Sequence, residues 1–366
     1  MVLREFVRSL FDGLSVLVLL LMGQGSGRQE RSKKLELATS ETMQAEADVQ
    51  SDKEEAEETK TRDERLRLVF GMADLKNKAI GLYNIGQTCC LNSLLQVFLM
   101  NTHFTGTLRR ITVPPSASQK RRSVPYQMLL LLEEMQCGKR KAVCPRALAC
   151  CLTEHRVKLF VQYDAAQLLL TLWNLVNKQM TNPELIEKLR DLYTICVQEC
   201  MLCQECSSET KRNSNMITLP LSMLDSGCHL LKTLSMKLVH LPQTLILHLK
   251  RFCLRKSASI HKLCHYLPFP QDLDFSAVLT EEQCQADASE KASWQYELFA
   301  VVVHSGSTDC GHYCAYIQSL TERKWYCFDD SEVCQVLWDD VKCTYGHSDL
   351  HWGQTAYLLV YMKKNS

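Results

Sequence analysis

The sequence lacks a marked excess of charge of either sign. Its 366 residues include 42 Lys and Arg and 41 Asp and Glu, which leaves a formal net charge of +1. Proteins that bind nucleic acid normally carry a basic excess or a basic stripe, so we do not expect a nucleic-acid partner. Bulk charge identifies no other class of partner.

A hydrophobic run long enough to span a membrane is also missing. The apolar run Leu14–Met22 is far shorter than the roughly 20 residues that a transmembrane helix needs. Arg4 and Arg8 precede this run and small residues follow it, which is the form of a secretory signal. We prefer a short amphipathic or buried helix, because the thiol-rich remainder suits a reducing compartment such as the cytoplasm or the nucleus. Secretion is the alternative.

Cysteine is absent from the N-terminal part of the chain. All 19 cysteines lie between Cys89 and Cys343, and their odd number and irregular spacing differ from those of secreted disulfide scaffolds. Residues 23–67 also lack aromatic side chains and carry many charges. We therefore interpret residues 1–71 as a leader that is mostly disordered after its apolar start. The folded domain is expected over residues 72–366.

Gly81–Phe98 carries the most informative motif. Its sequence, GLYNIGQTCCLNSLLQVF, places two adjacent cysteines between a glycine-containing turn and an amphipathic segment. The apolar residues of that segment follow helical spacing, at Leu91, Leu94, Leu95, Phe98 and Leu99. Cys89 and Cys90 thus lie at a predicted helix N-terminus, where unpaired N–H groups and the helix dipole favour a thiolate. Two buried, unreactive cysteines are the alternative, since free cysteine is often buried.

Helical periodicity continues through the first half of the domain, and strand-like alternation replaces it in the second. Further helices are expected from Pro125, from Asp164 as N-cap, and over Pro183–Tyr193. A loop is expected over Ile111–Val124, with the basic patch Lys120, Arg121 and Arg122. Strands are expected at 244–252, 296–304, 311–318, 324–328 and 355–362. Helices followed by strands indicate an α+β domain.

A cysteine nucleophile needs a base and a group that orients the base. His312 follows Gly311 at the start of a predicted strand, and Asp329 and Asp330 follow the predicted strand that ends in WYCF. If the two strands are neighbours, a carboxylate can hold the imidazole. Each residue alone is a weak indication, because single histidines are usually structural and acidic pairs are common in turns.

Taken together, these motifs resemble those of the ubiquitin-specific protease family. GLYNIGQTCCLNSLLQVF is similar to its cysteine box, and YELFAVVVHSGSTDCGHYCAYI with KWYCFDDSEV is similar to its histidine box. VQYDAAQLLLTLWNLV resembles the glutamine and aspartate box between them, and LPQTLILHLKRF the strand before the histidine box. The resemblance covers about Ile80 to Met362. It implies a papain-like cysteine protease fold with thumb, palm and fingers.

A narrower similarity points to one branch of this family. NIGQTCCLNSLLQVF, RRSVPYQMLLLLEEMQ and the ending from CTYG to TAYLLVYMK resemble its interferon-induced members. Those members remove a modifier built of two ubiquitin folds from proteins. The resemblance therefore implies the same class of substrate for this chain.

The resemblance also implies roles for individual residues. Cys89 would be the nucleophile and Cys90 its bystander. His312 would be the base, and Asp329 would orient it with Asp330 as a helper. These roles are carried over from the family, residue by residue, onto matching positions of this sequence.

Two further residues are implied to contact the substrate. Asn84 is placed to donate to the oxyanion of the reaction. Ubiquitin-like tails end in arginine followed by glycines, and Asp164 would bind that arginine. The same carboxylate is expected to cap its helix with one oxygen and to leave the other oxygen free. His304, a second histidine near the motif, is expected to be a structural neighbour.

A cysteine cluster raises the question of zinc. Cys200, Cys203 and Cys206 form C-x-x-C-x-x-C, which can begin a tetrahedral zinc site. The family usually holds zinc with two separated C-x-x-C pairs, and the second pair is missing here. We therefore expect no required cofactor, and a structural zinc only if Cys228 or His229 supplies the fourth ligand. The short interval after Cys206 also predicts shortened fingers.

The sequence thus predicts a cysteine isopeptidase that removes a ubiquitin-like modifier from lysines of conjugated proteins. Thiolate attack, an acyl-enzyme and hydrolysis would follow one another. The resemblance implies negative regulation of type I interferon signalling, with type I interferon receptor components as partners. Two alternatives remain open: a general deubiquitinase, and a largely non-catalytic scaffold or inhibitor of interferon receptor signalling.

Overall fold

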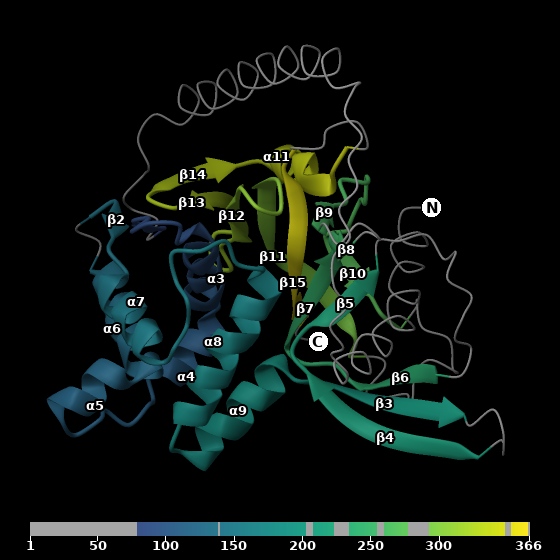
Figure 1. Ribbon diagram of the computed structural model, residues 1–366, viewed down its shortest axis with the longest axis horizontal. Coiled ribbons are helices and arrows are strands. Elements are labelled where there is room, and N and C mark those ends of the chain that lie inside the picture. The colour runs from purple at the N-terminus through teal and green to yellow at the C-terminus, as the bar shows by residue number, and fades with distance from the viewer. Residues whose placement is uncertain are drawn as a thin grey trace, which may run out of the picture.

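The computed structural model describes residues 79–137, 140–202, 208–222, 234–254, 260–276, 293–347 and 353–364. The expected leader over residues 1–71 and the expected start of the domain at residue 72 lie outside them. Helices form one side of the described structure and β-sheets form the other (Figure 1). Within this described part, no helix is both long enough and apolar enough to cross a membrane.

The helical side comes from the first half of the described chain. Its helices are α3 (Cys89–Met100), α4 (Thr102–Leu108), α5 (Ala117–Arg122), α6 (Val124–Gln136), α7 (Arg146–Glu154), α8 (Ala165–Gln179) and α9 (Pro183–Tyr193). Asp164 caps α8, because its Oδ1 accepts hydrogen bonds from the N–H groups of Ala166 and Gln167. Proline occupies the first turn of both α6 and α9. These three helices begin where the sequence predicts.

The expected loop over residues 111–124 contains a helix instead. Helix α5 begins after Ser116, which forms a reciprocal capping box with Gln119 and so satisfies two backbone N–H groups. The basic patch lies on this helix, where Arg121 approaches Glu154 of α7 at 3.1 Å. No side chain of α5 is buried, so local capping and charge pairing form this helix without an apolar face.

An eight-stranded sheet forms the centre of the other side. Its order is β14-β13-β12-β11-β15-β7-β5, and β10 pairs with β11 beside this path. The strands are β5 (Leu219–Ser222), β7 (Thr244–Lys250), β10 (Asp272–Asp274), β11 (Gln295–Gly306), β12 (Gly311–Gln318), β13 (Trp325–Asp329), β14 (Glu332–Val336) and β15 (Thr355–Lys363). The five strands expected from alternation are β7, β11, β12, β13 and β15. The predicted α+β class is confirmed.

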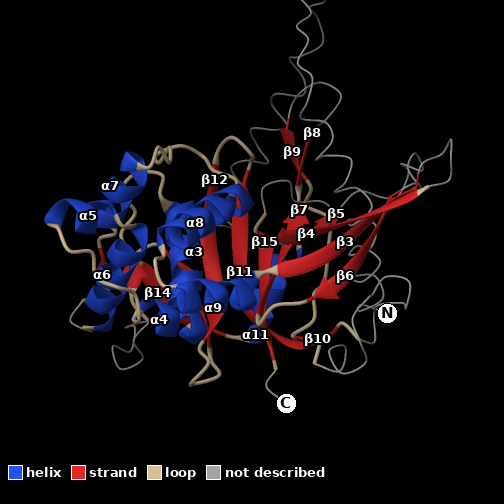
Figure 2. Ribbon diagram, turned by 90° about the horizontal axis from the view of Figure 1, so that it is seen from below, coloured by secondary structure: helices blue, strands red, loops and turns tan. Residues whose placement is uncertain are grey.

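Smaller sheets flank the central one. They are β1 (Gly81–Leu82) with β2 (Ala142–Val143), β8 (Phe252–Leu254) with β9 (Ile260–Lys262), and β4 (Glu209–Met216) with β3 (Ile195–Leu202) and β6 (Leu234–His240). The sheet β4-β3-β6 extends away from the helices (Figure 2), and the predicted shortened fingers stay a prediction. The short α11 (Trp338–Lys342) and the 3₁₀ turn η3 (Cys343–Tyr345) precede β15.

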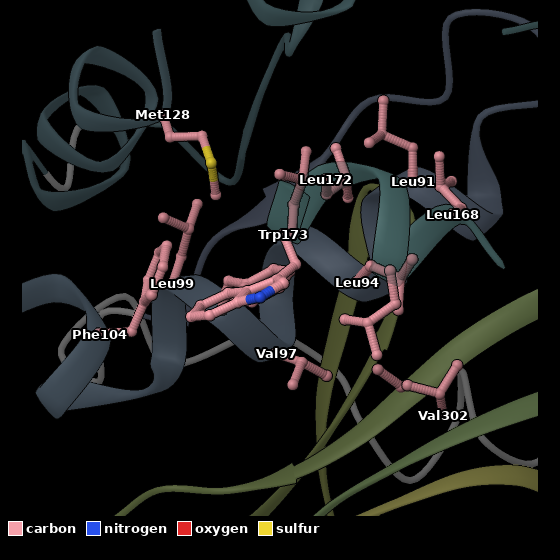
Figure 3. Close-up of a cluster of buried hydrophobic side chains, with 14 of the residues drawn as sticks. Leu91, Leu94, Val97, Leu99, Phe104, Met128, Leu168, Leu172, Trp173 and Val302 are labelled. Carbon is pink, nitrogen blue, oxygen red and sulfur yellow. The ribbon is translucent and has the colours of Figure 1, made fainter. Parts of the chain in front are cut away.

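Helix α3 joins the two sides of the structure. It packs against β12 of the central sheet and against α8 of the helical side. Leu94 of α3, Trp173 of α8 and Val302 of β11 belong to one buried cluster (Figure 3). Even the polar side chains of α3 are buried, so this helix has no solvent face until its last residue. Burial on all sides fixes the position of Cys89 at its N-terminus.

The packing between α8 and α3 predicts a difference between two leucines of α8. Leu168 is 1% exposed and Leu170 is 46% exposed. We expect Leu168→Ala to lower the free energy of unfolding by about 2–5 kcal/mol, because it leaves a cavity in the core. Leu170→Ala is the matched control and should change it by about 0.5 kcal/mol. Urea unfolding measures both values, and equal losses would contradict the packing described here.

Candidate active site

Cys89, His312 and Asp329 meet where α3 lies against the central sheet. Cys89 is the first residue of α3, and His312 is the second residue of β12. The Cys89 thiol is hydrogen-bonded to the His312 ring. On the other side of the ring, Nε2 lies 2.5 Å from Oδ1 of Asp329, the last residue of β13. Nδ1 is therefore the ring nitrogen left for the thiol.

The two partners of His312 change its protonation. The hydrogen bond to Asp329 and the hydrogen bond to Cys89 raise the pKa of His312 from 6.5 to about 10, against the opposing effect of burial. The ring is thus protonated at neutral pH and can stabilise a neighbouring thiolate. The side chain of His312 is 40% exposed and that of Asp329 is 52% exposed. Solvent, and hence a substrate, can reach this pair.

Cys90 and His304 lie beside this group and are buried, as Cys89 itself is. Burial raises the pKa of the Cys90 thiol well above its usual value. Burial, with Lys262 and His312 nearby, lowers the pKa of His304 to about 3. Both side chains are therefore uncharged at neutral pH, which suits the expected bystander and structural roles.

The close packing of His304 also explains the glycine before His312. A Cβ atom at Gly311 would lie 2.1 Å from Nε2 of His304. Only glycine allows the chain to pass the buried histidine so closely. Gln162 contacts the same residue, because its Nε2 donates to the carbonyl oxygen of Gly311 at 3.0 Å. The backbone that leads into His312 is thus held from two sides.

Asn84 lies in the exposed turn between β1 and α3. Its Oδ1 accepts hydrogen bonds from the N–H groups of Gly86 and Thr88, at 3.0 and 3.1 Å. Its Nδ2 donates to Oδ2 of Asp330 at 2.8 Å. An amide nitrogen carries two N–H bonds, so one of them remains for a substrate. Asn84 is therefore hydrogen-bonded to Thr88, the residue that precedes Cys89, and its second N–H has no partner among the described residues.

Asp330 connects the turn after β13 to the segment that carries Cys89. It occupies the two-residue turn before β14 with a positive φ of 50°. Besides Asn84, its carboxylate accepts a hydrogen bond from Nδ2 of Asn92, a residue of α3, at 2.7 Å. Its backbone oxygen accepts the N–H of Leu82 at 2.8 Å.

The sequence motifs single out Asp330 but not Asn92. The available signal is that Asn92 is a polar residue within a mostly apolar helix, a property that it shares with Ser93 and Gln96. Its position three residues after Cys89 places it one helical turn further along the same helix.

The second oxygen of Asp164 is not free, so that expectation is wrong. Oδ2 accepts a hydrogen bond from the hydroxyl of Tyr357 at 2.7 Å. The negative charge of Asp164 also acts on His248 and Lys250 of β7, whose pKa values are lowered overall by burial. A carboxylate oxygen has two acceptor sites, so Asp164 retains the capacity to accept from a guanidinium group. Asp164 is half-buried between the helical side and the central sheet.

The candidate zinc ligands cannot be brought together from the described residues. Cys200 lies on β3, and its side chain is buried. Cys203, Cys206 and Cys228 lie outside the described residues, so the zinc site stays a prediction. In the described part of the chain, the group of potential ligands that lie within 4.8 Å of one another is His312, Asp329 and Asp330.

A comparison with protein families matches residues 80–361 to the family described as ubiquitin carboxyl-terminal hydrolase. The chain belongs to this family. The α+β arrangement is thus the papain-like fold of these hydrolases, and the protein is a cysteine peptidase. The matched range contains both motifs that meet in the structure and runs from just before β1 into β15.

Individual proteins that are similar to this chain also carry the names of carboxyl-terminal hydrolases. A human protein named Ubl carboxyl-terminal hydrolase 18 is 50% identical, in an alignment that covers 79% of this chain and 86% of that protein. A mouse protein of the same name is 48% identical, and the alignment covers 80% of this chain and 88% of that protein. Ubiquitin carboxyl-terminal hydrolase 47 of Xenopus tropicalis is 26% identical, and the alignment covers 78% of this chain and 28% of that protein.

The charge on His312 predicts a characteristic pH dependence. The ring should titrate far above 6.5 in NMR, and Asp329→Asn should move the midpoint down because it removes the largest cause of the shift. Since the folded pKa exceeds the unfolded one, this stabilisation is fully present below about pH 6.5 and is lost as the pH rises through about 10.

The same dependence should appear in unfolding experiments. The difference in stability between wild type and Asp329→Asn should shrink as the pH rises over that interval. Asp339→Asn, a change at an exposed site on α11, serves as the control and should not move the His312 midpoint. A His312 midpoint near 6.5 in the wild-type protein would contradict the geometry.

Proposed function

We propose that this protein is a cysteine isopeptidase that removes a ubiquitin-like modifier from lysine side chains of conjugated proteins. The observation that carries the proposal is the His312 ring held between the Cys89 thiol and the Asp329 carboxylate. Because the chain belongs to the ubiquitin carboxyl-terminal hydrolase family, we infer that this group cleaves the bond made by the C-terminus of a ubiquitin-like modifier. This bond joins the C-terminal glycine of the modifier to a lysine amine.

The roles of the residues follow from their positions. The Cys89 thiolate attacks the glycine carbonyl, and protonated His312 gives its proton to the leaving lysine amine. Neutral His312 then takes a proton from the water that hydrolyses the acyl-enzyme. Asp329 holds the ring through Nε2, so Nδ1 keeps facing the thiol. The second N–H of Asn84 would donate to the oxyanion, with the N-terminus of α3 on the same side.

The substrate class is argued from the tail that the site must accept. Ubiquitin-like tails carry an arginine before the terminal glycines, and the half-buried Asp164 offers a negative charge for it. The hydrogen bond from Tyr357 holds this carboxylate in one orientation. The human and mouse relatives are named as hydrolases of ubiquitin-like proteins, which supports the same class for this chain. On the resemblance of the sequence motifs, we propose that the substrate is the interferon-stimulated modifier of two ubiquitin folds.

The cellular setting is also a proposal. The cysteines of the described residues are free thiols, which supports a reducing compartment, the cytoplasm or the nucleus. Type I interferon receptor components are proposed as partners on the resemblance alone. The enzyme would act on conjugated proteins in that compartment.

Substitution of the two adjacent cysteines tests the assignment of the nucleophile. We expect Cys89→Ala to abolish release of a fluorophore from the C-terminus of a ubiquitin-like modifier, because no other described thiol contacts His312. Cys90→Ala is the matched control and should retain release, since the side chains that act on His312 are Asp329 and Cys89 and not Cys90. Asn84→Ala should lower kcat by ~10²–10³-fold, the usual effect of losing one oxyanion donor.

The outcomes separate clearly. Release by the Cys89→Ala protein, or loss of release in Cys90→Ala with an unchanged unfolding transition, would overturn the assignment. A wild-type protein that releases none of a panel of modifiers would overturn the proposed function itself.

A further inference from the structure

We propose that Asn92 is a positioning residue for this hydrolase. Through the Asp330 carboxylate, it fixes the direction in which the Asn84 amide faces the reacting carbonyl. The proposal rests on the function proposed above, in which Asn84 donates to the oxyanion. Asn92 itself touches no reacting atom.

The donor side of Asn92 is fully engaged while its acceptor side is not. The residue is 2% exposed, and its Nδ2 donates to Oδ1 of Asp330 at 2.7 Å. The carbonyl oxygens of Leu82 and Tyr83 lie 3.3 and 3.4 Å from the same nitrogen. Its Oδ1 is buried and has no hydrogen-bond partner among the described residues. A buried oxygen without a partner is costly, so the hydrogen bonds that Nδ2 donates must offset this cost.

The hydrogen bonds run in series from α3 to the oxyanion donor. Asn92 holds Oδ1 of Asp330, and a carboxylate is planar, so the direction of Oδ2 is fixed as well. Oδ2 accepts from Nδ2 of Asn84 at 2.8 Å. Both bonds go to a charged acceptor, which makes them stronger than bonds between neutral groups. The Asn84 amide is planar too, so one fixed N–H bond directs the other.

The other end of the Asn84 amide is held independently. Gly86 and Thr88 donate to its Oδ1, so the amide cannot turn over without losing bonds at both ends. Cys89 directly follows Thr88, and Asn92 lies one turn further along the same helix. The nucleophile and the anchor of the oxyanion donor therefore belong to one rigid element. Such preorganisation matters because a donor aimed in advance needs no reorientation in the transition state.

A neighbouring residue separates this role from ordinary packing. Gln96, also on α3 and also 2% exposed, donates through Nε2 to the carbonyl oxygen of Ile80 at 2.8 Å. Asn92 and Gln96 are thus two buried amides that tie α3 to the segment around β1. Only Asn92 of this pair also reaches Asp330. Gln96→Ala therefore measures the cost of losing such a tie without disturbing the series of bonds.

Two reactions of Cys89 distinguish the roles. Hydrolysis at the modifier C-terminus develops an oxyanion, whereas alkylation by iodoacetamide does not. Loss of a whole oxyanion donor costs ~10²–10³-fold, so we expect Asn92→Ala to lower kcat by at least about tenfold, with KM changed less than about threefold. The alkylation rate should stay within about twofold of wild type, and Gln96→Ala should leave both rates within about twofold.

Coupling and pH dependence provide a second readout. The double variant Asn92→Ala, Asp330→Ala should have the same kcat as Asp330→Ala alone, because both changes break the same series of bonds. In Asn92→Asp, the new carboxyl at position 92 faces the Asp330 carboxylate, so the pKa of the new carboxyl rises. Its protonated form can then donate a hydrogen bond to Asp330 in place of the amide. The kcat of Asn92→Asp relative to wild type should therefore rise as the pH falls from about 8 to about 6.

The inference fails if Asn92→Ala and Gln96→Ala lose kcat equally, or if Asn92→Ala slows alkylation as much as hydrolysis. It also fails if the effects of Asn92→Ala and Asp330→Ala multiply in the double variant. These results presuppose an active wild-type protein. A wild-type protein without hydrolase activity would overturn the proposed function, whereas the outcomes above overturn the role of Asn92 in an active enzyme, so the two failures are distinguishable.

Discussion

The packing of α3 against β12 is the constraint on which the site depends. The proposed nucleophile begins this helix, while the proposed base and its orienting carboxylate lie on β12 and β13. Neither the helix nor the two strands alone carry the complete group of nucleophile, base and orienting carboxylate. Burial of α3 on nearly all sides allows it one position, and this position places the Cys89 thiol against the His312 ring. The large hydrophobic core thus serves a site that consists of a few polar atoms.

The charged pair at the site is partly exposed, whereas the neighbouring neutral groups are buried. His312 and Asp329 are partly exposed and form an ion pair, whereas burial keeps Cys90 and His304 uncharged at neutral pH. The second carboxylate, Asp330, accepts two amide donors and ties the turn after β13 to α3 and to the turn before it. Neutral amides can hold a carboxylate without adding positive charge that would compete with His312 for the thiolate.

Local rules predicted much of the fold from the sequence. The interval Pro183–Tyr193 is a helix with the expected bounds, because a proline in its first turn and an apolar stripe define it locally. Helix α5 was missed because a capping box forms it without an apolar face. The motifs also identified the residues that meet around His312.

Long-range contacts at the site could not be predicted in this way. Asn92 and Asp330 are 238 residues apart in sequence, and Asp164 and Tyr357 are 193 apart. Helical periodicity identifies Asn92 only as a polar position and does not indicate its hydrogen-bond partner.

The assignment of the nucleophile is tested most directly by labelling the wild-type protein with C-terminal electrophile probes made from ubiquitin and from the two-fold modifier. The adduct is then mapped by mass spectrometry. We expect an adduct on Cys89 with a ubiquitin-like probe, whereas an adduct on Cys90 or another cysteine, or no adduct with either probe, would contradict the assignment of Cys89 as the nucleophile.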